Sequence, residues 1–153
     1  MNPEPQTAPL KILLADDDID DRLFFARALK EIPIACNLIA VSDGEKLMDY
    51  LDKNSEELPD ILFLDLSMPR KTGFECLSEI KENEKMKNIP VFVFTISFPH
   101  NEEFENNIKN MLSKIGANDY INKTSNLAEL KEIIHKALIK VTASKLPNKN
   151  AEN

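Results

Sequence analysis

Four places along the chain carry side chains that can bind a cation or a phosphoryl group. Three aspartates stand together as Asp16-Asp-Asp18, and Asp65 follows a later apolar run. Thr95 and Lys123 each follow or end a further run of this kind. Carboxylates gathered within ~4 Å of one another repel by several kcal/mol even at an effective dielectric constant of ~20. A cluster of these aspartates therefore favours a bound cation.

The types of ligand favour a hard divalent cation. An oxygen-only set without His or Cys indicates Mg²⁺, whose octahedral shell keeps several waters and is usually completed by phosphate oxygens. Thr95 can then donate a hydrogen bond to a phosphoryl oxygen, and Lys123 can neutralise a second one. Asp65 is the best-placed nucleophile, because a carboxylate can take up a phosphoryl group as an aspartyl phosphate.

Five short apolar runs, often β-branched, must position these groups. They are Lys11–Ala15, Cys36–Val41, Asp60–Leu64, Pro90–Thr95 and Asp119–Asn122. The middle runs are apolar at successive positions, which is typical of strands buried on both faces of a parallel sheet. In such open sheets ligands bind beyond the carboxyl ends of the strands, where these polar groups stand.

Segments with helical periodicity separate the runs. Ser42-Asp-Gly-Glu45 predicts a capping box at the start of one helix, and Asn126-Leu-Ala-Glu129 predicts another at the start of the last. Asp18 is interpreted as the cap of the first helix, and Gly116 as the left-handed residue that ends a later one. Alternating strands and helices predict right-handed βαβ units, and hence an α/β fold with a doubly wound, five-stranded parallel sheet.

Length and composition fit one domain. The chain has 153 residues, of which 42% are hydrophobic, so it can bury a core of its own. The predicted β/α units use residues 10–141. The ends, residues 1–9 and 142–153, are polar or contain proline, so we expect flexible termini and no effector domain.

Charge and apolar content disfavour several classes of protein. The chain has 19 Lys and Arg against 26 Asp and Glu, a net charge of −7 that disfavours binding to nucleic acid or to an anionic membrane. No apolar run approaches the length of a membrane span, and the first residues lack the basic start of a signal peptide. Cys36 and Cys76 are too few for a disulfide framework, so we expect a cytoplasmic protein.

Four motifs at successive strand ends carry a family resemblance. They are Leu13-Leu-Ala-Asp-Asp-Asp18, Phe63-Leu-Asp-Leu-Ser-Met-Pro69 with Gly73 after it, Val93-Phe-Thr95, and Gly116-Ala-Asn-Asp-Tyr-Ile-Asn-Lys123. Together they resemble the response-regulator receiver domain of two-component signalling, over about residues 10–141. The resemblance implies a (βα)5 flavodoxin-like fold with the strand order 2-1-3-4-5 of chemotaxis receivers. The stretch Leu14–Arg22 is also similar to the small regulators paired with phytochrome-type kinases.

The resemblance implies a phosphoacceptor and a set of metal ligands. Asp65 takes the phosphoryl group, and Asp16 and Asp17 hold Mg²⁺ together with Asp65 and the main-chain carbonyl of Ser67. From the residues alone, the choice of ligands within the run of three aspartates stays open, because a strand buried on both faces has no alternation to decide it.

The resemblance also implies a switch and its partners. Thr95 is the switch hydroxyl, Lys123 the phosphate-binding lysine, and Tyr120 the aromatic residue that turns inward on activation. A histidine kinase or histidine phosphotransfer protein donates the phosphoryl group. The receiver catalyses only its own phosphorylation and dephosphorylation, so it is not an enzyme for other substrates. Downstream proteins bind the face of the fourth helix, fifth strand and fifth helix.

The last predicted helix carries more apolar residues than one core face needs. Ile133, Ile134 and Leu138 lie close together along it. The sequence is therefore compatible with a homodimer formed through the fourth or fifth helix.

Two positions depart from the receiver pattern. Thr124 follows Lys123 where the family usually has proline, and Ile96 follows Thr95 where the family prefers a small residue. We expect slower phosphorylation or slower hydrolysis, without loss of the site. The segment 95–116 is longer than usual and contains Ser97-Phe-Pro-His100; a partner-specific fourth helix and a passive surface insertion both stay open.

Other functions fit the residues less well. A Mg²⁺-dependent phosphatase with an aspartyl nucleophile needs a general acid two residues after it, where Ser67 stands. A flavodoxin-like electron carrier needs a phosphate-binding loop after the first strand, where this chain has three aspartates. A pseudo-receiver that binds partners without phosphorylation stays open because of Ile96 and Thr124.

Overall fold

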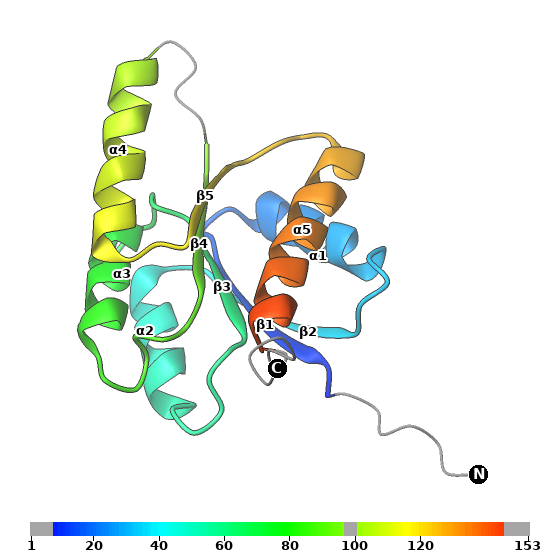
Figure 1. Ribbon diagram of the computed structural model, residues 1–153, viewed down its shortest axis with the longest axis horizontal. Coiled ribbons are helices and arrows are strands. Elements are labelled where there is room, and N and C mark those ends of the chain that lie inside the picture. Colours follow the sequence, from blue (N-terminus) through cyan, green and yellow to red (C-terminus); the bar gives the residue numbers. More distant parts are fainter. Residues whose placement is uncertain (1–7, 97–100, 146–153) are drawn as a thin grey trace, which may run out of the picture.

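The computed structural model describes residues 8–96 and 101–145, which form one five-stranded sheet and five helices (Figure 1). The strands are β1 (Leu10–Ala15), β2 (Cys36–Val41), β3 (Ile61–Leu64), β4 (Val91–Thr95) and β5 (Asp119–Asn122). The helices are α1 (Ile19–Lys30), α2 (Gly44–Lys53), α3 (Gly73–Glu82), α4 (Glu102–Ile115) and α5 (Leu127–Lys145). All five predicted strands are present.

All strands of the sheet are parallel, in the order β2-β1-β3-β4-β5. Helices α1 and α5 cover one face, and α2, α3 and α4 cover the other (Figure 1). The predicted doubly wound α/β fold and its strand order are therefore confirmed. Because β1, β3, β4 and β5 run in the same direction, the residues that follow them meet at one edge of the sheet.

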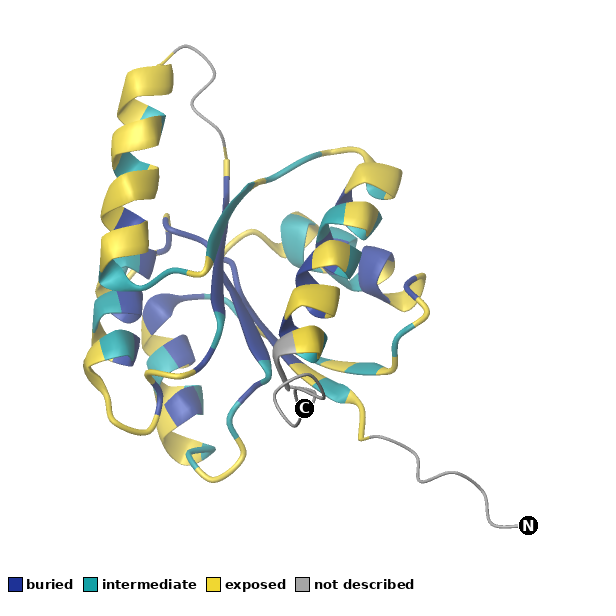
Figure 2. Cartoon of the chain, viewed as in Figure 1, coloured by how far each residue is buried: buried dark blue, intermediate teal, exposed yellow. Residues whose placement is uncertain are grey.

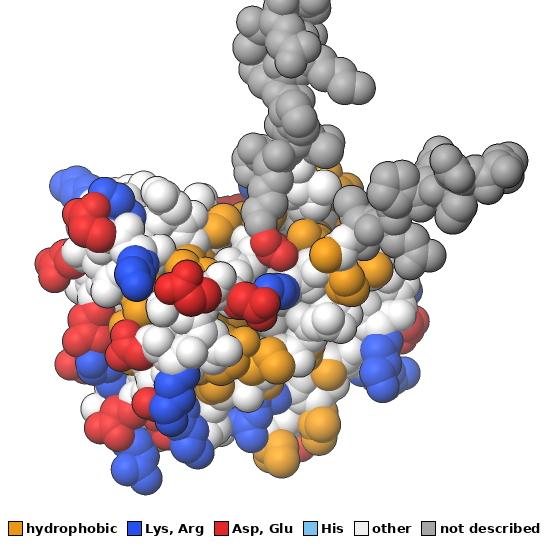
Figure 3. Space-filling view, turned by 90° about the horizontal axis from the view of Figure 1, so that it is seen from below, with side chains coloured by type: hydrophobic (Ala, Val, Ile, Leu, Met, Phe, Trp, Pro, Cys, Tyr) orange, Lys and Arg blue, Asp and Glu red, His pale blue; other side chains and the backbone are white. Residues whose placement is uncertain are grey.

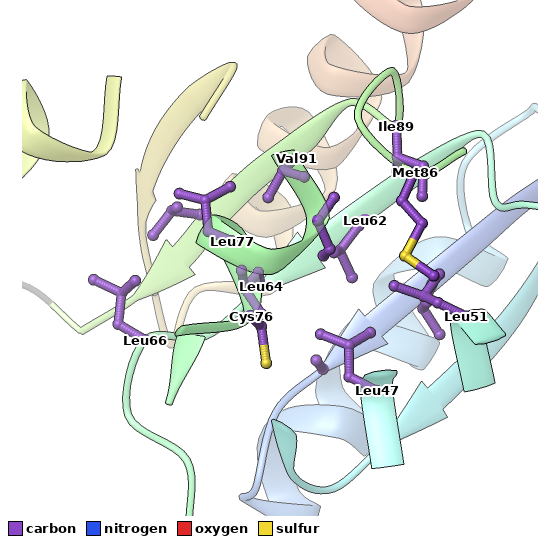
Figure 4. Close-up of a cluster of buried hydrophobic side chains, with 14 of the residues drawn as sticks. Leu47, Leu51, Leu62, Leu64, Leu66, Cys76, Leu77, Met86, Ile89 and Val91 are labelled. Atoms are coloured by element: carbon purple, nitrogen blue, oxygen red, sulfur yellow. The ribbon is translucent and has the colours of Figure 1, made fainter. Parts of the chain in front are cut away.

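The two faces of the sheet pack into two separate cores. In β3, Leu62 and Leu64 point toward α2 and α3, whereas Ile61 and Phe63 point toward α1 and α5. Figure 4 shows the first cluster, in which leucines of β3 lie among side chains from α2 and α3. Each fully buried side chain of this size contributes about 1.5–3 kcal/mol relative to exposure. Burial on both sides explains why the central strands are apolar at every position.

The helix ends follow the sequence with one correction. Asp18 caps α1 and accepts hydrogen bonds from two backbone N–H groups of its first turn, and Gly116 ends α4 with φ 129°, both as expected. The cap of α2 is Asp43, one residue later than the predicted Ser42. Its carboxylate accepts from the backbone N–H of Lys46 at 2.8 Å. A short aspartate here outcompetes the serine because it also bears charge at the positive helix end.

Helix α5 begins as predicted and continues further than predicted. Asn126 accepts a hydrogen bond from the backbone N–H of Glu129 at 2.9 Å, which caps the helix. Residues 142–145, which were predicted from the sequence to belong to the C-terminal tail, continue α5 in the structure. Thr142 donates its hydroxyl hydrogen to the carbonyl of Leu138 at 2.7 Å. Residues 1–7 and 146–153 lie outside the described residues.

The apolar residues of α5 belong to the core. Ile134 and Leu138 are completely buried in the cluster between α5, α1 and the sheet, and Ile133 is half-buried. These residues therefore do not form an exposed apolar surface of the kind from which the sequence suggested a homodimer. Among the described residues of this helix, Ile139 is the large hydrophobic residue that is exposed.

Helix α4 is the least buried of the five helices (Figure 2). Of its fourteen residues, only Leu112 is fully buried, and Ile108 and Ile115 pack against the core from the same side. The long segment before it includes residues 97–100, so the Ser97-Phe-Pro-His100 run lies outside the described residues. The helix is thus held mainly through its second half.

The surface carries charges of both signs. On the face seen from below in Figure 3, acidic and basic side chains are interspersed, and hydrophobic side chains gather near its middle. Among the described residues, no helix is both long enough and apolar enough to cross a membrane.

Candidate functional site

Three carboxylates meet at the carboxyl ends of β1 and β3. Asp16 and Asp17 follow β1 and Asp65 follows β3, and each offers an oxygen within 4.8 Å of the other two. Asp16 and Asp65 are buried, whereas Asp17 is exposed. The structure therefore brings together the three predicted side-chain ligands of a divalent cation, with oxygen donors of the kind that Mg²⁺ and Mn²⁺ accept.

Lys123 is the cation of this cluster. Its Nζ lies 2.8 Å from Oδ2 of Asp16, 2.8 Å from Oδ2 of Asp21 and 3.2 Å from Oδ2 of Asp65. Burial alone would lower the pKa of a lysine. Contacts with Asp16 and Asp21, and the attraction of Asp65, outweigh burial and raise the pKa of Lys123 above its ordinary value. Lys123 is therefore firmly protonated.

Asp16 is the most deeply buried carboxylate of the site, with no exposed surface. Burial raises the pKa of Asp16, and the contact with Lys123 and the backbone N–H of Asp18 offset part of that rise. The hydrogen bond from Asp18 N–H to Oδ1 of Asp16 measures 3.0 Å. A buried carboxylate with this penalty is a group that a divalent cation would stabilise in its charged form.

Thr95 contacts the carboxylate of Asp65 from the β4 side. The threonine is buried, and its hydroxyl donates a hydrogen bond to Oδ1 of Asp65 at 3.1 Å. Its carbonyl accepts a hydrogen bond from the backbone N–H of Lys123 at 2.7 Å. The ends of β4 and β5 are thus joined directly beside Asp65, and each of its carboxylate oxygens already has a donor of the type that a phosphoryl oxygen needs.

The loop after β3 is packed tightly against the site. The backbone N–H of Ser67 donates to Oδ1 of Asp65 at 3.3 Å, so Ser67 lies beside this carboxylate. A Cβ atom on Gly73 would lie 2.2 Å from the carbonyl oxygen of Asp65, which explains the glycine at this position. Arg70 takes a left-handed φ of 70°, and its Nε lies 3.5 Å from Oδ2 of the buried Asp43.

Tyr120 lies further along β5, opposite Val93 of β4. Its hydroxyl is buried and has no hydrogen-bond partner among the described residues. The Nζ of Lys109 lies 5.2 Å from the centre of its ring, a cation–π contact between α4 and β5. The hydroxyl is thus shielded from solvent, and burial raises its pKa.

A protein-family model describes the same region. The model of the response regulator receiver domain matches residues 12–135. The chain belongs to this family. Receivers of this family act in two-component signalling, and the resemblance seen in the four sequence motifs is confirmed.

Relatives of this receiver include phytochrome response regulators. Response regulator Rcp1 of Synechocystis sp. is 35% identical over 132 residues, which cover 82% of this chain and 84% of the relative. Among solved structures, the phosphorylated cyanobacterial phytochrome response regulator RcpA superposes with a TM-score of 0.74 at 29% identity, over 91% of this chain and 98% of that one. The Mn²⁺-bound form of Rcp1 also has a TM-score of 0.74, at 32% identity, over 92% of this chain and 100% of that one.

The two departures from the receiver pattern lie beside Lys123. Ile96 is 61% exposed and lines a shallow hollow together with Phe24, Lys123 and Thr124. Among the described residues there is no cis peptide bond, so Thr124 follows Lys123 through a trans peptide. The hollow opens to solvent beside Lys123.

One member of the receiver site was not predicted from the sequence. Asp21 lies in the first turn of α1 and donates no ligand to the acidic cluster, but its carboxylate accepts a hydrogen bond from Nζ of Lys123 at 2.8 Å. The sequence did contain a signal for Asp21. It stands three residues after the cap Asp18, in the first turn of the helix that follows β1. Its partner Lys123 is 102 residues away in sequence, so sequence spacing alone does not pair them.

Proposed function

We propose that this receiver accepts a phosphoryl group on Asp65 from a phosphohistidine of a histidine kinase or phosphotransfer protein, in a Mg²⁺-dependent reaction. The observation that carries the proposal is the surroundings of Asp65. One carboxylate oxygen of Asp65 accepts a hydrogen bond from Thr95, and the other contacts Lys123. Asp16, Asp17 and Asp65 each offer a carboxylate oxygen, and these oxygens lie within 4.8 Å of one another. The relatives RcpA, in a phosphorylated form, and Rcp1, in a Mn²⁺-bound form, support it.

The residues present fit a divalent cation. Asp16, Asp17 and Asp65 would hold it, with the main-chain carbonyl of Ser67 as a fourth protein ligand. When bound, the cation supplies positive charge that neutralises the carboxylates and the incoming phosphoryl oxygens. The buried position and raised pKa of Asp16 agree with a site in which the contact with Lys123 offsets only part of the cost of burying the carboxylate.

The chain's own residues account for the transfer. A carboxylate oxygen of Asp65 attacks phosphorus, a new P–O bond forms, and the P–N bond to the donor histidine breaks with its electron pair left on the imidazole nitrogen. The hydroxyl of Thr95 and the ammonium of Lys123, which donate to Asp65 beforehand, donate to the phosphoryl oxygens instead. Hydrolysis of the aspartyl phosphate returns the protein to its starting state, so the protein acts as a signalling switch.

The switch is transmitted through β4 and β5. Phosphorylation adds up to about two negative charges and three acceptor oxygens, which draw Thr95 and Lys123 toward them. We propose that Tyr120, which lies on β5 and contacts Lys109 of α4, then changes its position, and that the α4-β5-α5 face is thereby altered for a downstream protein.

The free thiols of Cys36 and Cys76 agree with a cytoplasmic setting for the phosphoryl transfer.

The test is intact-mass spectrometry after incubation with acetyl phosphate, with and without MgCl₂. We expect one phosphoryl adduct on the wild type with Mg²⁺, and none with excess EDTA. Asp65→Asn should give no adduct, whereas Asp52→Asn, which removes an exposed aspartate of α2, should behave as the wild type.

Three results would overturn the proposal. An adduct that persists on Asp65→Asn would place the acceptor elsewhere. A wild type that takes no adduct from acetyl phosphate or from a phosphorylated phosphotransfer protein would indicate a pseudo-receiver that acts without phosphorylation. Continuous turnover of a phosphate ester would instead indicate a phosphatase.

A further inference from the structure

Asp21 lies outside the acidic cluster but contacts its lysine. Its Oδ2 accepts a hydrogen bond from Nζ of Lys123 at 2.8 Å, and its side chain is 38% exposed. The first turn of α1 places it there, because Asp18 accepts from the backbone N–H of Asp21 at 3.2 Å and of Asp20 at 2.8 Å. The position of Asp21 is thus set by the helix cap.

The three carboxylates around Lys123 differ in what else they do. Asp16 and Asp65 both belong to the set that can hold a divalent cation, and Asp21 does not. A divalent cation at the cluster takes up oxygens of Asp16 and Asp65 and repels the nearby ammonium. Asp21 is then the carboxylate that still attracts Lys123 and is not used by the cation.

We propose that Asp21 is a positioning residue that retains Lys123 beside Asp65 when a divalent cation occupies the acidic cluster. This inference rests on the proposed phosphoacceptor function of the same site. Without Asp21, the ammonium pairs with Asp16 and Asp65 alone and competes directly with the cation for their oxygens. With Asp21, the lysine can leave Asp16 without leaving the site, so the cation and the lysine are present together when the phosphoryl group arrives.

The chain offers a matched control in the same turn. Asp20 carries the same charge one residue earlier and is exposed, and its carboxylate has no ion pair among the described residues. Asp20→Asn therefore repeats the change in net charge near the site without removing the contact with Lys123. Asp21→Glu keeps the negative charge and the ability to reach the ammonium.

The first experiment measures Mn²⁺ binding by calorimetry, in the absence of any phosphodonor. A charge-assisted hydrogen bond of this kind predicts that Asp21→Asn weakens Mn²⁺ binding by about tenfold when Lys123 is present. In a Lys123→Met background the same change should have an effect of less than about threefold, because only long-range charge is lost. Asp20→Asn should match that small effect in both backgrounds, and Asp21→Glu should restore most of the affinity.

The second experiment measures the rate of adduct formation from acetyl phosphate at saturating Mg²⁺. We expect Asp21→Asn to be about tenfold slower than the wild type and Asp20→Asn to be unchanged. Thermal unfolding of each variant without metal checks that the fold is kept. If Asp21→Asn weakens Mn²⁺ binding equally with and without Lys123, or behaves as Asp20→Asn, the inference is wrong. A wild type without any adduct refutes the proposed function, whereas the Mn²⁺ measurement still tests Asp21.

Discussion

At the scale of single residues, the ammonium of Lys123 supplies positive charge that partly balances the aspartates of the site. Four aspartates surround the site, and one ammonium contacts three of them. The lysine holds the carboxylates together, but it offsets only part of the rise that burial causes in the pKa of Asp16, the most buried of them. The carboxylates that form the site therefore also lower the stability of the fold when no metal is bound.

The raised pKa of Asp16 predicts a stabilising substitution. An acid whose pKa is higher in the folded than in the unfolded state destabilises the fold once the pH exceeds that raised pKa. Asp16→Asn should therefore increase the free energy of unfolding at pH 7 without metal, by roughly 1 kcal/mol, as measured by urea denaturation. The gain should shrink as the pH falls through the raised pKa of Asp16, and it should vanish well below the ordinary value of 3.8, where Asp16 is protonated in both states.

The matched control for this prediction is Asp17→Asn. It removes the same charge from the neighbouring exposed position and should give no comparable gain. An Asp16→Asn variant that is less stable than the wild type at pH 7 would show that the pairing with Lys123 outweighs the burial of the carboxylate.

At the scale of elements, the geometry of the site depends on how closely the start of α3 packs against the segment that directly follows β3. The backbone N–H of Gly73 donates to the carbonyl of Leu66 at 3.0 Å, and α3 begins at that glycine. Thr72 and Glu75 form a capping box that fixes the same helix end. The start of α3 is thereby held against the backbone of Asp65, and the loop between them has little freedom.

Gly73→Ala should disturb both stability and phosphorylation. The added Cβ would lie 2.2 Å from the carbonyl oxygen of Asp65, a backbone atom that cannot move without shifting β3 or α3. We expect a loss of about 1–3 kcal/mol in urea denaturation, together with slower adduct formation. Asn106→Ala, at an exposed position of α4, should change stability by less than about 0.5 kcal/mol. A Gly73→Ala protein as stable as the wild type would show that the loop is less confined than its contacts indicate.

Helix α4 stands apart from the other elements in its packing. Its core contacts come from Leu112, Ile108 and Ile115, whereas Met111 is 45% exposed. A helix held by one short apolar stripe can shift at lower cost than one packed along its length. This weak attachment lies next to Tyr120, on the face where we propose that phosphorylation is read.

At the scale of the whole molecule, a ligand that binds at the edge of the sheet affects the stability of the entire fold. Asp16 and Asp65 are continuous with β1 and β3, which lie at the centre of the sheet between the two cores. A ligand that binds this edge binds the folded state alone, because the unfolded chain does not bring the carboxylates together. Binding of a divalent cation must therefore stabilise the entire domain.

Addition of MgCl₂ at about a hundred times its dissociation constant should stabilise the protein by about 2.7 kcal/mol, which corresponds to a rise in Tm of about 5–10 °C. Differential scanning calorimetry measures the shift, and EDTA should reverse it. Asp17→Asn, which removes an exposed ligand without creating a buried cavity, should reduce the shift strongly. An equal shift in the wild type and in Asp17→Asn would contradict the assigned metal site.

The sequence by itself determined the strands, their parallel arrangement and the main members of the site. Apolar runs buried on both faces, helix caps such as Asp18, and polar residues at strand ends are local signals, so they can be recognised without knowing which segments meet. These signals led to the run Asp16-Asp-Asp18 and to Asp65, Thr95 and Lys123, whereas the choice of Asp16 within the run came from the family resemblance. The structure brings Asp16, Asp65, Thr95 and Lys123 together.

Only the tertiary structure decided the pairings between distant segments. It placed Asp21 on Lys123, exchanged Ser42 for Asp43 as the cap of α2, and buried Ile134 and Leu138 in the core instead of exposing them. The physical reason is that a side-chain contact across 102 residues, or the choice of which helix face is covered, depends on the packing of helices against the sheet. Periodicity along the chain reports which residues are apolar, but it does not report which neighbour covers them.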